Sequence, residues 1–178
     1  MDLSVKAVKV TSLKSVLFQS KLALIVLSLA IPAIQTNAAT ATSTMAVSAT
    51  VLTACSVAAS PLTFGSYDVA GAAVNVSSTV EVTCTGGSSY TIALGVGGGS
   101  GATFASRKMS FGRGTLSYSI YTDAARTVVW GDGTGGSNTV SGTGSLSMVT
   151  HTAYGSIPAG QSTNAGVYTD SVSVTLNY

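Results

Sequence analysis

The stretch that closes the sequence, Gly166–Tyr178, ends in a regular alternation of apolar and polar side chains. One face carries Val172, Val174, Leu176 and Tyr178, and the other carries Ser173, Thr175 and Asn177. A period of two predicts a β-strand that buries one face. Because no further strand follows, we expect one edge of this strand to lack a partner. The stretch has no Lys, Pro or Glu to discourage pairing with another chain.

The same alternation recurs along the chain in short runs that are separated by Gly-rich connections. The predicted strands are Val74–Cys84, Tyr90–Val96 and Leu116–Ile120, with shorter candidates at Val128–Trp130 and Leu146–Val149. No long helical period follows residue 39. Short strands with turn signals between them predict an all-β sandwich.

The N-terminal region has the pattern of a secretory signal peptide. Four lysines lie within residues 1–21, and the apolar run Leu22–Ile31 follows. This run is shorter than the roughly 20 apolar residues that span a bilayer. A basic region, a short apolar region and small residues beyond it predict a signal peptide over residues 1–38, cleaved after Ala38 or Ala39. The alternative is an amphipathic helix on a membrane surface. A cleaved signal implies export from the cytoplasm.

The remaining residues, 39–178, contain few charges. Four basic and five acidic side chains leave a formal net charge of −1. Only 8% of the whole sequence is charged, against about 25% in ordinary soluble domains. A nucleic-acid-binding protein would present a clustered basic surface, and the sequence shows none. We therefore expect no nucleic-acid partner.

Residues 44–52 form a second alternating segment, close to the predicted mature N-terminus. Met45, Val47, Ala49 and Val51 would share one face. We expect a strand here, preceded by a small polar tail. Its position permits two interpretations: an ordinary first strand of the sandwich, or a strand that completes a neighbouring molecule.

Cys55 and Cys84 are the only cysteines in the sequence. In an exported protein a single pair predicts an intramolecular disulfide. Two cysteines with the single histidine, His151, make a poor zinc site, because tetrahedral zinc takes three or four protein ligands.

No motif in the sequence supports catalysis or cofactor binding. Gly131–Gly136 matches G-x-G-x-x-G, but no helix pattern follows it, so we interpret it as a hairpin loop. Asp132, Thr134 and Asn138 are not followed by the glutamate of a calcium loop. We interpret His151 as a surface residue on an edge strand, because a nucleophile–base pair needs an orienting carboxylate. We expect no enzyme activity, no metal and no small-molecule cofactor.

Several stretches, in order, resemble the spore coat protein U family. They are Cys55–Tyr67 (CSVAASPLTFGSY), Val80–Thr85, Leu116–Asp123, Trp130–Gly133, Tyr154–Gln161 and Gly166–Asp170 with the terminal strand. The resemblance covers residues 45–178. The sequence is similar above all to the major pilins of archaic chaperone–usher pili of the Csu type.

This resemblance implies an immunoglobulin-like sandwich that lacks its last strand and is completed by donor-strand complementation. Residues 39–53 would be the donor segment, and 54–178 the pilin domain. Met45, Val47, Ala49 and Val51 would fill the groove of the next copy, whose edge strand carries Val172, Val174, Leu176 and Tyr178.

The implied partners are copies of the chain in a homopolymer, a periplasmic chaperone, an outer-membrane usher, and tip and minor pilins. The implied location is the cell surface, reached through the periplasm, with adhesion and biofilm formation as the fibre's role. Because the chain has one cysteine pair and room for one sandwich, we expect a shaft subunit. The alternatives are a spore-coat structural protein of the same fold and a monomeric carbohydrate-binding module completed by its own N-terminal strand.

Overall fold

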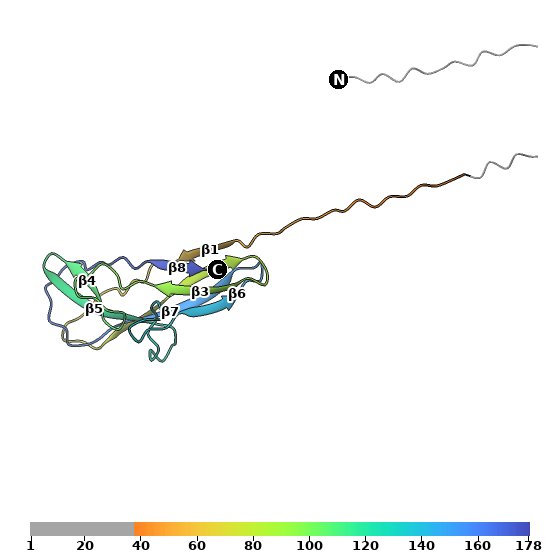
Figure 1. Ribbon diagram of the computed structural model, residues 1–178. Coiled ribbons are helices and arrows are strands. Elements are labelled where there is room, and N and C mark those ends of the chain that lie inside the picture. Colours follow the sequence, from red (N-terminus) through yellow and green to blue (C-terminus); the bar gives the residue numbers. More distant parts are fainter. Residues whose placement is uncertain (1–37) are drawn as a thin grey trace, which may run out of the picture. The chain divides into compact units, whose positions relative to one another are not determined.

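The structure is a computed structural model that describes residues 38–178. The predicted signal peptide therefore lies almost wholly outside the described residues. From Cys55 onward the chain forms strands joined by turns and loops (Figure 1). The strands are β1 (Cys55–Ala59), β2 (Val74–Cys84), β3 (Ser89–Leu94), β4 (Arg107–Phe111), β5 (Gly114–Tyr121), β6 (Val140–Thr143), β7 (Val149–Ile157) and β8 (Val174–Asn177). Within residues 38–178 there is no helix of the length and hydropathy needed to cross a membrane.

The strands are arranged in two sheets whose ladders are antiparallel. The larger sheet has the order β1-β2-β7-β5-β4, and the smaller has the order β6-β3-β8. β1 and β8 are edge strands of different sheets, and they lie side by side (Figure 1). No hydrogen-bonded ladder joins this pair in the described part of the chain. The sandwich therefore has a seam between β1 and β8.

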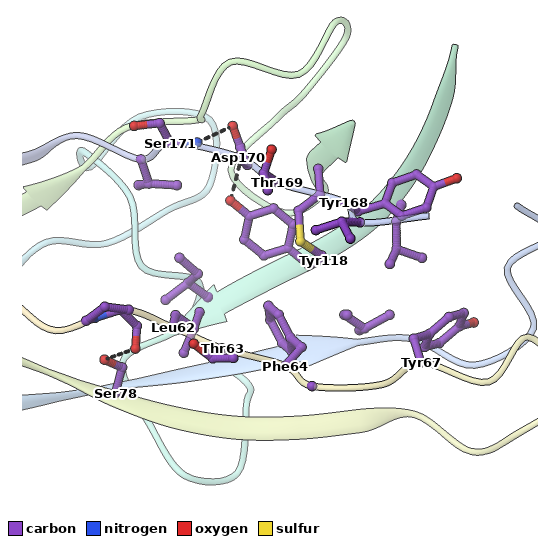
Figure 2. Close-up of a pocket in the computed structure, with 18 of the residues that line it drawn as sticks. Leu62, Thr63, Phe64, Tyr67, Ser78, Tyr118, Tyr168, Thr169, Asp170 and Ser171 are labelled. Carbon is purple, nitrogen blue, oxygen red and sulfur yellow. Dashed lines mark hydrogen bonds between the residues drawn. The ribbon is translucent and has the colours of Figure 1, made fainter. Parts of the chain in front are cut away.

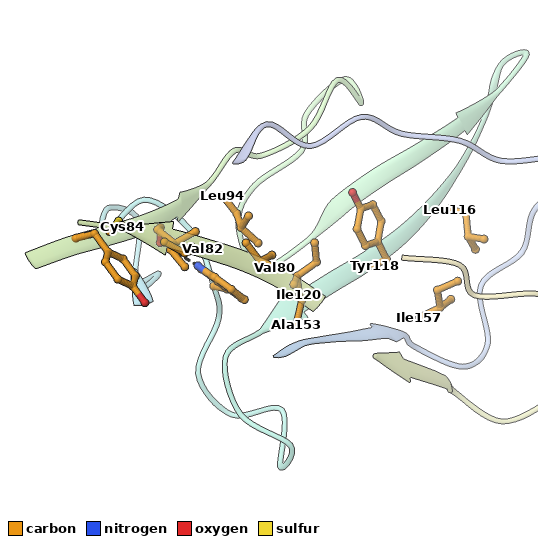
Figure 3. Close-up of a cluster of buried hydrophobic side chains, with 12 residues drawn as sticks. Val80, Val82, Cys84, Leu94, Leu116, Tyr118, Ile120, Ala153 and Ile157 are labelled. Atoms are coloured by element: carbon orange, nitrogen blue, oxygen red, sulfur yellow. Dashed lines mark hydrogen bonds between the residues drawn. The ribbon is translucent and has the colours of Figure 1, made fainter. Parts of the chain in front are cut away.

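The core lies between the sheets and is built from the alternating positions of the long strands. Its fully buried apolar side chains include Val82, Ile92 and Ile157, and Trp130 is buried on the connection between β5 and β6. Figure 3 shows the cluster with residues from β2, β3, β5 and β7 pointing into it. Alternation in β2, β3 and β5 is thus explained by burial of one face.

Several strand boundaries differ from the predicted ones. β8 is shorter than expected and leaves Val172 and Tyr178 outside the strand. Val128–Trp130 contributes isolated bridges only, and β7 begins at Val149, where the Leu146–Val149 candidate ends. β1, β4 and β6 were not predicted at all. A short strand depends on its partners for pairing, so its own sequence defines it poorly.

Residues 44–52 form no strand, and all of their side chains are exposed. The expectation of a strand within the chain's own sheets is wrong for this segment. The physical reason is that a β-strand exists through cross-strand hydrogen bonds, and this segment has no ladder partner within residues 38–178.

The predicted disulfide is present. Cys55 opens β1, Cys84 closes β2, and the two residues are paired directly across the antiparallel ladder. The bond ties the first residue of the seam strand to the core, because Cys84 is buried while Cys55 is half-buried.

Candidate functional site: an apolar groove at the seam

A groove of about 1140 Å³ opens between the segment that follows β1 and the segment that precedes β8. We name the segments the Leu62 wall (residues 59–69) and the Tyr168 wall (residues 163–174). In Figure 2, Leu62, Phe64 and Tyr67 follow one another along one side, and Ser171, Asp170 and Tyr168 follow in the same direction along the other. The two walls therefore run antiparallel.

The floor of the groove consists of core side chains. It comprises Leu94 of β3, Met109 of β4, Leu116, Tyr118 and Ile120 of β5, and Ala153 and Ile157 of β7. All of these except the half-buried Met109 are buried. An apolar strip of this kind, open between two strand edges, offers the surroundings that one face of a further strand requires.

The Leu62 wall leaves the larger sheet at Pro61. The Ser60 amide makes the last backbone bond to β2, donating to the Thr79 carbonyl at 2.9 Å. The Ser78 hydroxyl then donates to the carbonyls of Ser60 and Pro61, at 2.8 and 3.1 Å. Among the described residues, no backbone–backbone bond involves the amides of residues 62–67. The amides of residues 62–67 are thus free to pair with a further strand.

Tyr67 holds the distal part of the Leu62 wall in place. Its hydroxyl donates to the Pro158 carbonyl at 3.0 Å and accepts from the Gln161 amide at 2.9 Å. The Gln161 side chain in turn binds both backbone groups of Ser117, at 2.7 and 2.8 Å, in the manner of a short strand. Both walls are therefore anchored through the loop that follows β7.

Asp170 anchors the Tyr168 wall. One carboxylate oxygen accepts from the Tyr118 hydroxyl at 2.7 Å, and the other accepts from the amides of Gly98 and Ser171 at 2.7 and 2.8 Å (Figure 2). Burial and the bond to Asp170 raise the pKa of Tyr118, so its phenol remains a donor. A side chain at Gly97 would collide with this carboxylate, so the glycine permits the approach.

A buried arginine supports the floor behind Asp170. Arg107 has no exposed surface and donates to the carbonyls of Gly95, Phe104 and Trp130 at 2.7–3.0 Å. Burial lowers the pKa of Arg107, and the nearby Tyr118 and Asp170 oppose this effect. Its three carbonyl partners satisfy the guanidinium in the core, which ties the β3–β4 connection to the connection between β5 and β6.

The backbone of the Tyr168 wall binds on one side only. Thr169 exchanges bonds with Ser110 of β4, and Ser173 accepts from Gly95 beyond β3. Because successive residues of an antiparallel strand direct their backbone groups to opposite edges, those of Val172 and Val174 face the open seam. Val172 and Val174 also line the groove, as the predicted edge strand requires.

The other two predicted edge residues lie elsewhere. Leu176 packs on the core but does not line the groove, and Tyr178 is exposed beside a shallow hollow on the β6–β3–β8 sheet. The donor residues Met45 and Val47 are each 87% exposed, and Ala49 and Val51 are exposed too. The structure of the single chain leaves their predicted role untested.

The Leu62 wall was not predicted as a groove-forming element. Leu62 and Phe64 point toward the groove, where Phe64 makes an edge contact with Tyr118 with centroids 5.8 Å apart. The signal was available: Leu62 and Phe64 alternate with polar residues directly after Pro61, which cannot donate to a ladder.

The interpretation of His151 is corrected. His151 lies in β7, which is an interior strand between β2 and β5, and its side chain is half-buried. Its ring nitrogen is 2.9 Å from the hydroxyl of the buried Tyr90. Burial lowers the pKa of His151. The histidine is thus part of the packing between the sheets and does not itself line the groove.

Comparison with known proteins places this chain in a family. A family model described as the Spore Coat Protein U domain matches residues 41–175. Protein U of Myxococcus xanthus is 35% identical over 158 residues, which cover 80% of this chain and 87% of that protein.

A solved structure shares the fold. It is the crystal structure of the CsuC–CsuE chaperone–tip adhesion subunit pre-assembly complex from archaic chaperone–usher Csu pili of Acinetobacter baumannii, with a TM-score of 0.56 and 21% sequence identity. The match covers 72% of this chain and 41% of that chain, so this chain spans about two fifths of its length. The expected all-β, immunoglobulin-like fold is confirmed, and by its sequence the chain belongs to the Spore Coat Protein U domain family.

Proposed function

We propose that this chain is a structural subunit of a chaperone–usher pilus and that its groove receives residues 44–52 of a second copy. One observation carries the proposal. The groove is apolar and has unpaired backbone groups on both walls, while the alternating segment 44–52 has no strand partner among the residues that the structure describes. Added strands gain affinity from backbone ladders and register from alternate side chains in pockets.

The segment and the groove suit each other chemically. Met45, Val47, Ala49 and Val51 would face the floor residues, while Ala46, Ser48 and Thr50 would face solvent. A strand of this length extends about 30 Å at roughly 3.3 Å per residue. Because donor and acceptor are different surfaces, the contact is heterologous and propagates into a filament instead of closing as a dimer.

The same geometry accounts for the proposed partners. An exported subunit with an open apolar groove needs a temporary strand from a periplasmic chaperone before an outer-membrane usher exchanges it for the next subunit. The shared fold with a chaperone–subunit complex supports this scheme. We propose a shaft position, with tip and minor pilins as other partners, and surface fibres for adhesion and biofilm formation.

The second candidate is a structural protein of a spore coat. The 35% identity to Protein U and the family's description favour it. Such a protein would use the same fold without an usher. Chaperone and usher genes beside the gene for this chain would favour the pilus, and their absence would favour the coat protein.

The direct test compares the chain from Ala39 with a truncated protein that begins at Leu52. Co-expressed with the chaperone, both should form a chaperone complex, because both keep the groove. Only the longer protein should form filaments under electron microscopy once the chaperone is displaced. Filaments of the truncated protein, or a stable monomer of the longer one with residues 44–52 protected from proteolysis, would contradict the proposal.

A further inference from the structure

Two groups of exposed apolar side chains lie at opposite ends of the sandwich. We name the first the cap, which consists of Leu52, Leu146 and Met148. We name the second the rim, which consists of Val69, Phe111 and Val167. The exposed fractions of Leu146 and Val167 are 75% and 77%. Large apolar side chains gathered in water at defined places mark contact surfaces.

The cap is built around the disulfide. The Leu146 amide donates to the Cys84 carbonyl at 3.1 Å, and the Leu146 side chain lies over Gly86. Thr85, between these two, exchanges backbone and side-chain bonds with Ala54 at 2.9–3.2 Å. The chain leading from residues 44–52 therefore enters the domain beside Leu146.

The backbone of Leu146 is held in an unfavourable conformation. Its φ is +64°, in the left-handed region that a Leu side chain rarely adopts. An exposed leucine gains nothing from burial in the single chain to offset this cost. A strained residue that presents a large apolar side chain to solvent is a reason to look for a partner.

The rim surrounds one mouth of the groove. Val69 ends the Leu62 wall and Val167 lies at the start of the Tyr168 wall, and both line the groove. The Phe111 ring lies against Gly166 and, with centroids 5.8 Å apart, beside Tyr168. The rim is thus an apolar border at the end of the groove that lies farthest from β1.

Only the rim end gives a bound strand room to continue into another domain. At the other end β1 and β8 lie side by side, and the walls converge on them at Ala59 and Val174 (Figure 1). A strand that is attached to a folded domain by its C-terminal end must therefore leave the groove past the rim.

We propose that the cap of each subunit packs on the rim of the copy whose groove holds its residues 44–52. This inference rests on the proposed function. Two residues, Thr53 and Ala54, separate Leu52 from Cys55. The distance between the Cα atoms of Leu52 and Cys55 is therefore at most about 11 Å. The entering domain must then lie close to the rim, and the end of the domain that reaches it carries Leu146.

The first test places a charge on the cap. Leu146→Asp should leave subunit folding intact, because Asp tolerates the left-handed region better than Leu. Polymers should lose subunits at least about tenfold faster in denaturant, since a carboxylate facing an apolar surface is poorly solvated. Ala125→Asp, which adds the same charge to an exposed loop residue outside both patches, should match the unmodified protein.

The second test restores the contact. Val167→Lys alone should also weaken polymers, and the double variant Leu146→Asp/Val167→Lys should recover much of the loss, because the two charges would face each other between copies. Equal dissociation rates for all variants would overturn the inference, as would additive losses in the double variant. A fall in chaperone-bound subunit caused by Leu146→Asp would assign the cap to a different partner and also overturn it.

The proposed function and this inference fail in distinguishable ways. If the full mature chain forms no polymer, or if polymers form without residues 44–52, the proposed function fails and the inference fails with it. If polymers need residues 44–52 but are insensitive to the cap and rim substitutions, only the inference fails.

Discussion

The carboxylate of Asp170 accepts a 2.7 Å hydrogen bond from the hydroxyl of Tyr118, and this contact fastens the chain's C-terminal segment to the floor of the groove. The same carboxylate accepts two backbone amides. The Asp170 side chain therefore fixes the position of the Tyr168 wall relative to β5.

Asp170→Ala should destabilise the isolated mature protein by about 3 kcal/mol or more, because three bonds to a charged acceptor are lost. Tyr118→Phe should cost less, about 1–2 kcal/mol, since the amides of Gly98 and Ser171 remain bound. Urea denaturation followed by tryptophan fluorescence would measure both. Equal losses in the two variants would show that the amide contacts contribute nothing.

Replacing both Cys55 and Cys84 with Ser should lower stability by about 3–4 kcal/mol, because the bond closes a loop between residues 29 positions apart. The single Cys55→Ser variant should show a comparable loss and one reactive thiol. Thiol labelling of the unreduced, denatured wild-type protein should detect no free cysteine, and two labelled cysteines would contradict the bond.

Val47→Asp should abolish filament formation, because the carboxylate would enter an apolar groove at a cost of several kcal/mol. Ser48→Asp supplies the matched control, since adjacent residues of a strand face opposite sides. Electron microscopy of the two variants after chaperone displacement would separate them. Normal filaments from Val47→Asp would rule out the predicted register of residues 44–52.

Acidification should weaken the fold through His151. Burial lowers its pKa in the folded protein below the ordinary value of 6.5, so the unfolded chain binds the proton first. Stability should therefore fall as the pH drops below about 6.5 and change little above it. His151→Gln should remove this slope between about pH 7 and pH 5. Asp123 and Asp132 have pKa values lowered by hydrogen bonds, chiefly to Val128 and Thr134, and their contributions are lost only at more acidic pH.

Thermal denaturation across this range would test the assignment, because the sequence contains one histidine. An unchanged slope in His151→Gln would assign the effect to another group.

β2, β3 and β5 were predictable because apolar residues alternate along one face of each, whereas the prediction overlapped β7 only at Val149. β2, β3 and β5 carry apolar residues at nearly every second position, and most of these pack in the core. The disulfide followed from the cysteine count and the predicted export. These features depend on local pattern or on composition alone.

β4 and the Leu62 wall could not be predicted, because their positions depend on contacts with residues distant in sequence. Arg107 is the first residue of β4 and has no exposed surface, although an arginine in a sequence ordinarily predicts a solvent-exposed position. It is buried because Gly95, Phe104 and Trp130 supply carbonyls, and this convergence exists only after folding. Gly155 likewise leaves room beside β7 for the rings and methyls of Leu62 and Phe64. The local sequence pattern does not predict such a contact.

The position of β8 has a consequence for how the molecule reaches its fold. Its partner β3 ends about 80 residues earlier in the chain, so the smaller sheet can be completed only after those intervening residues are present. Pairings of such long range are slow to form. Until β8 arrives, β3 exposes one edge to every other unfinished copy nearby. The yield of folded protein should therefore depend on two competing rates as much as on final stability. One is the rate at which β8 pairs with β3, and the other is the rate at which β3 pairs with another partly folded copy.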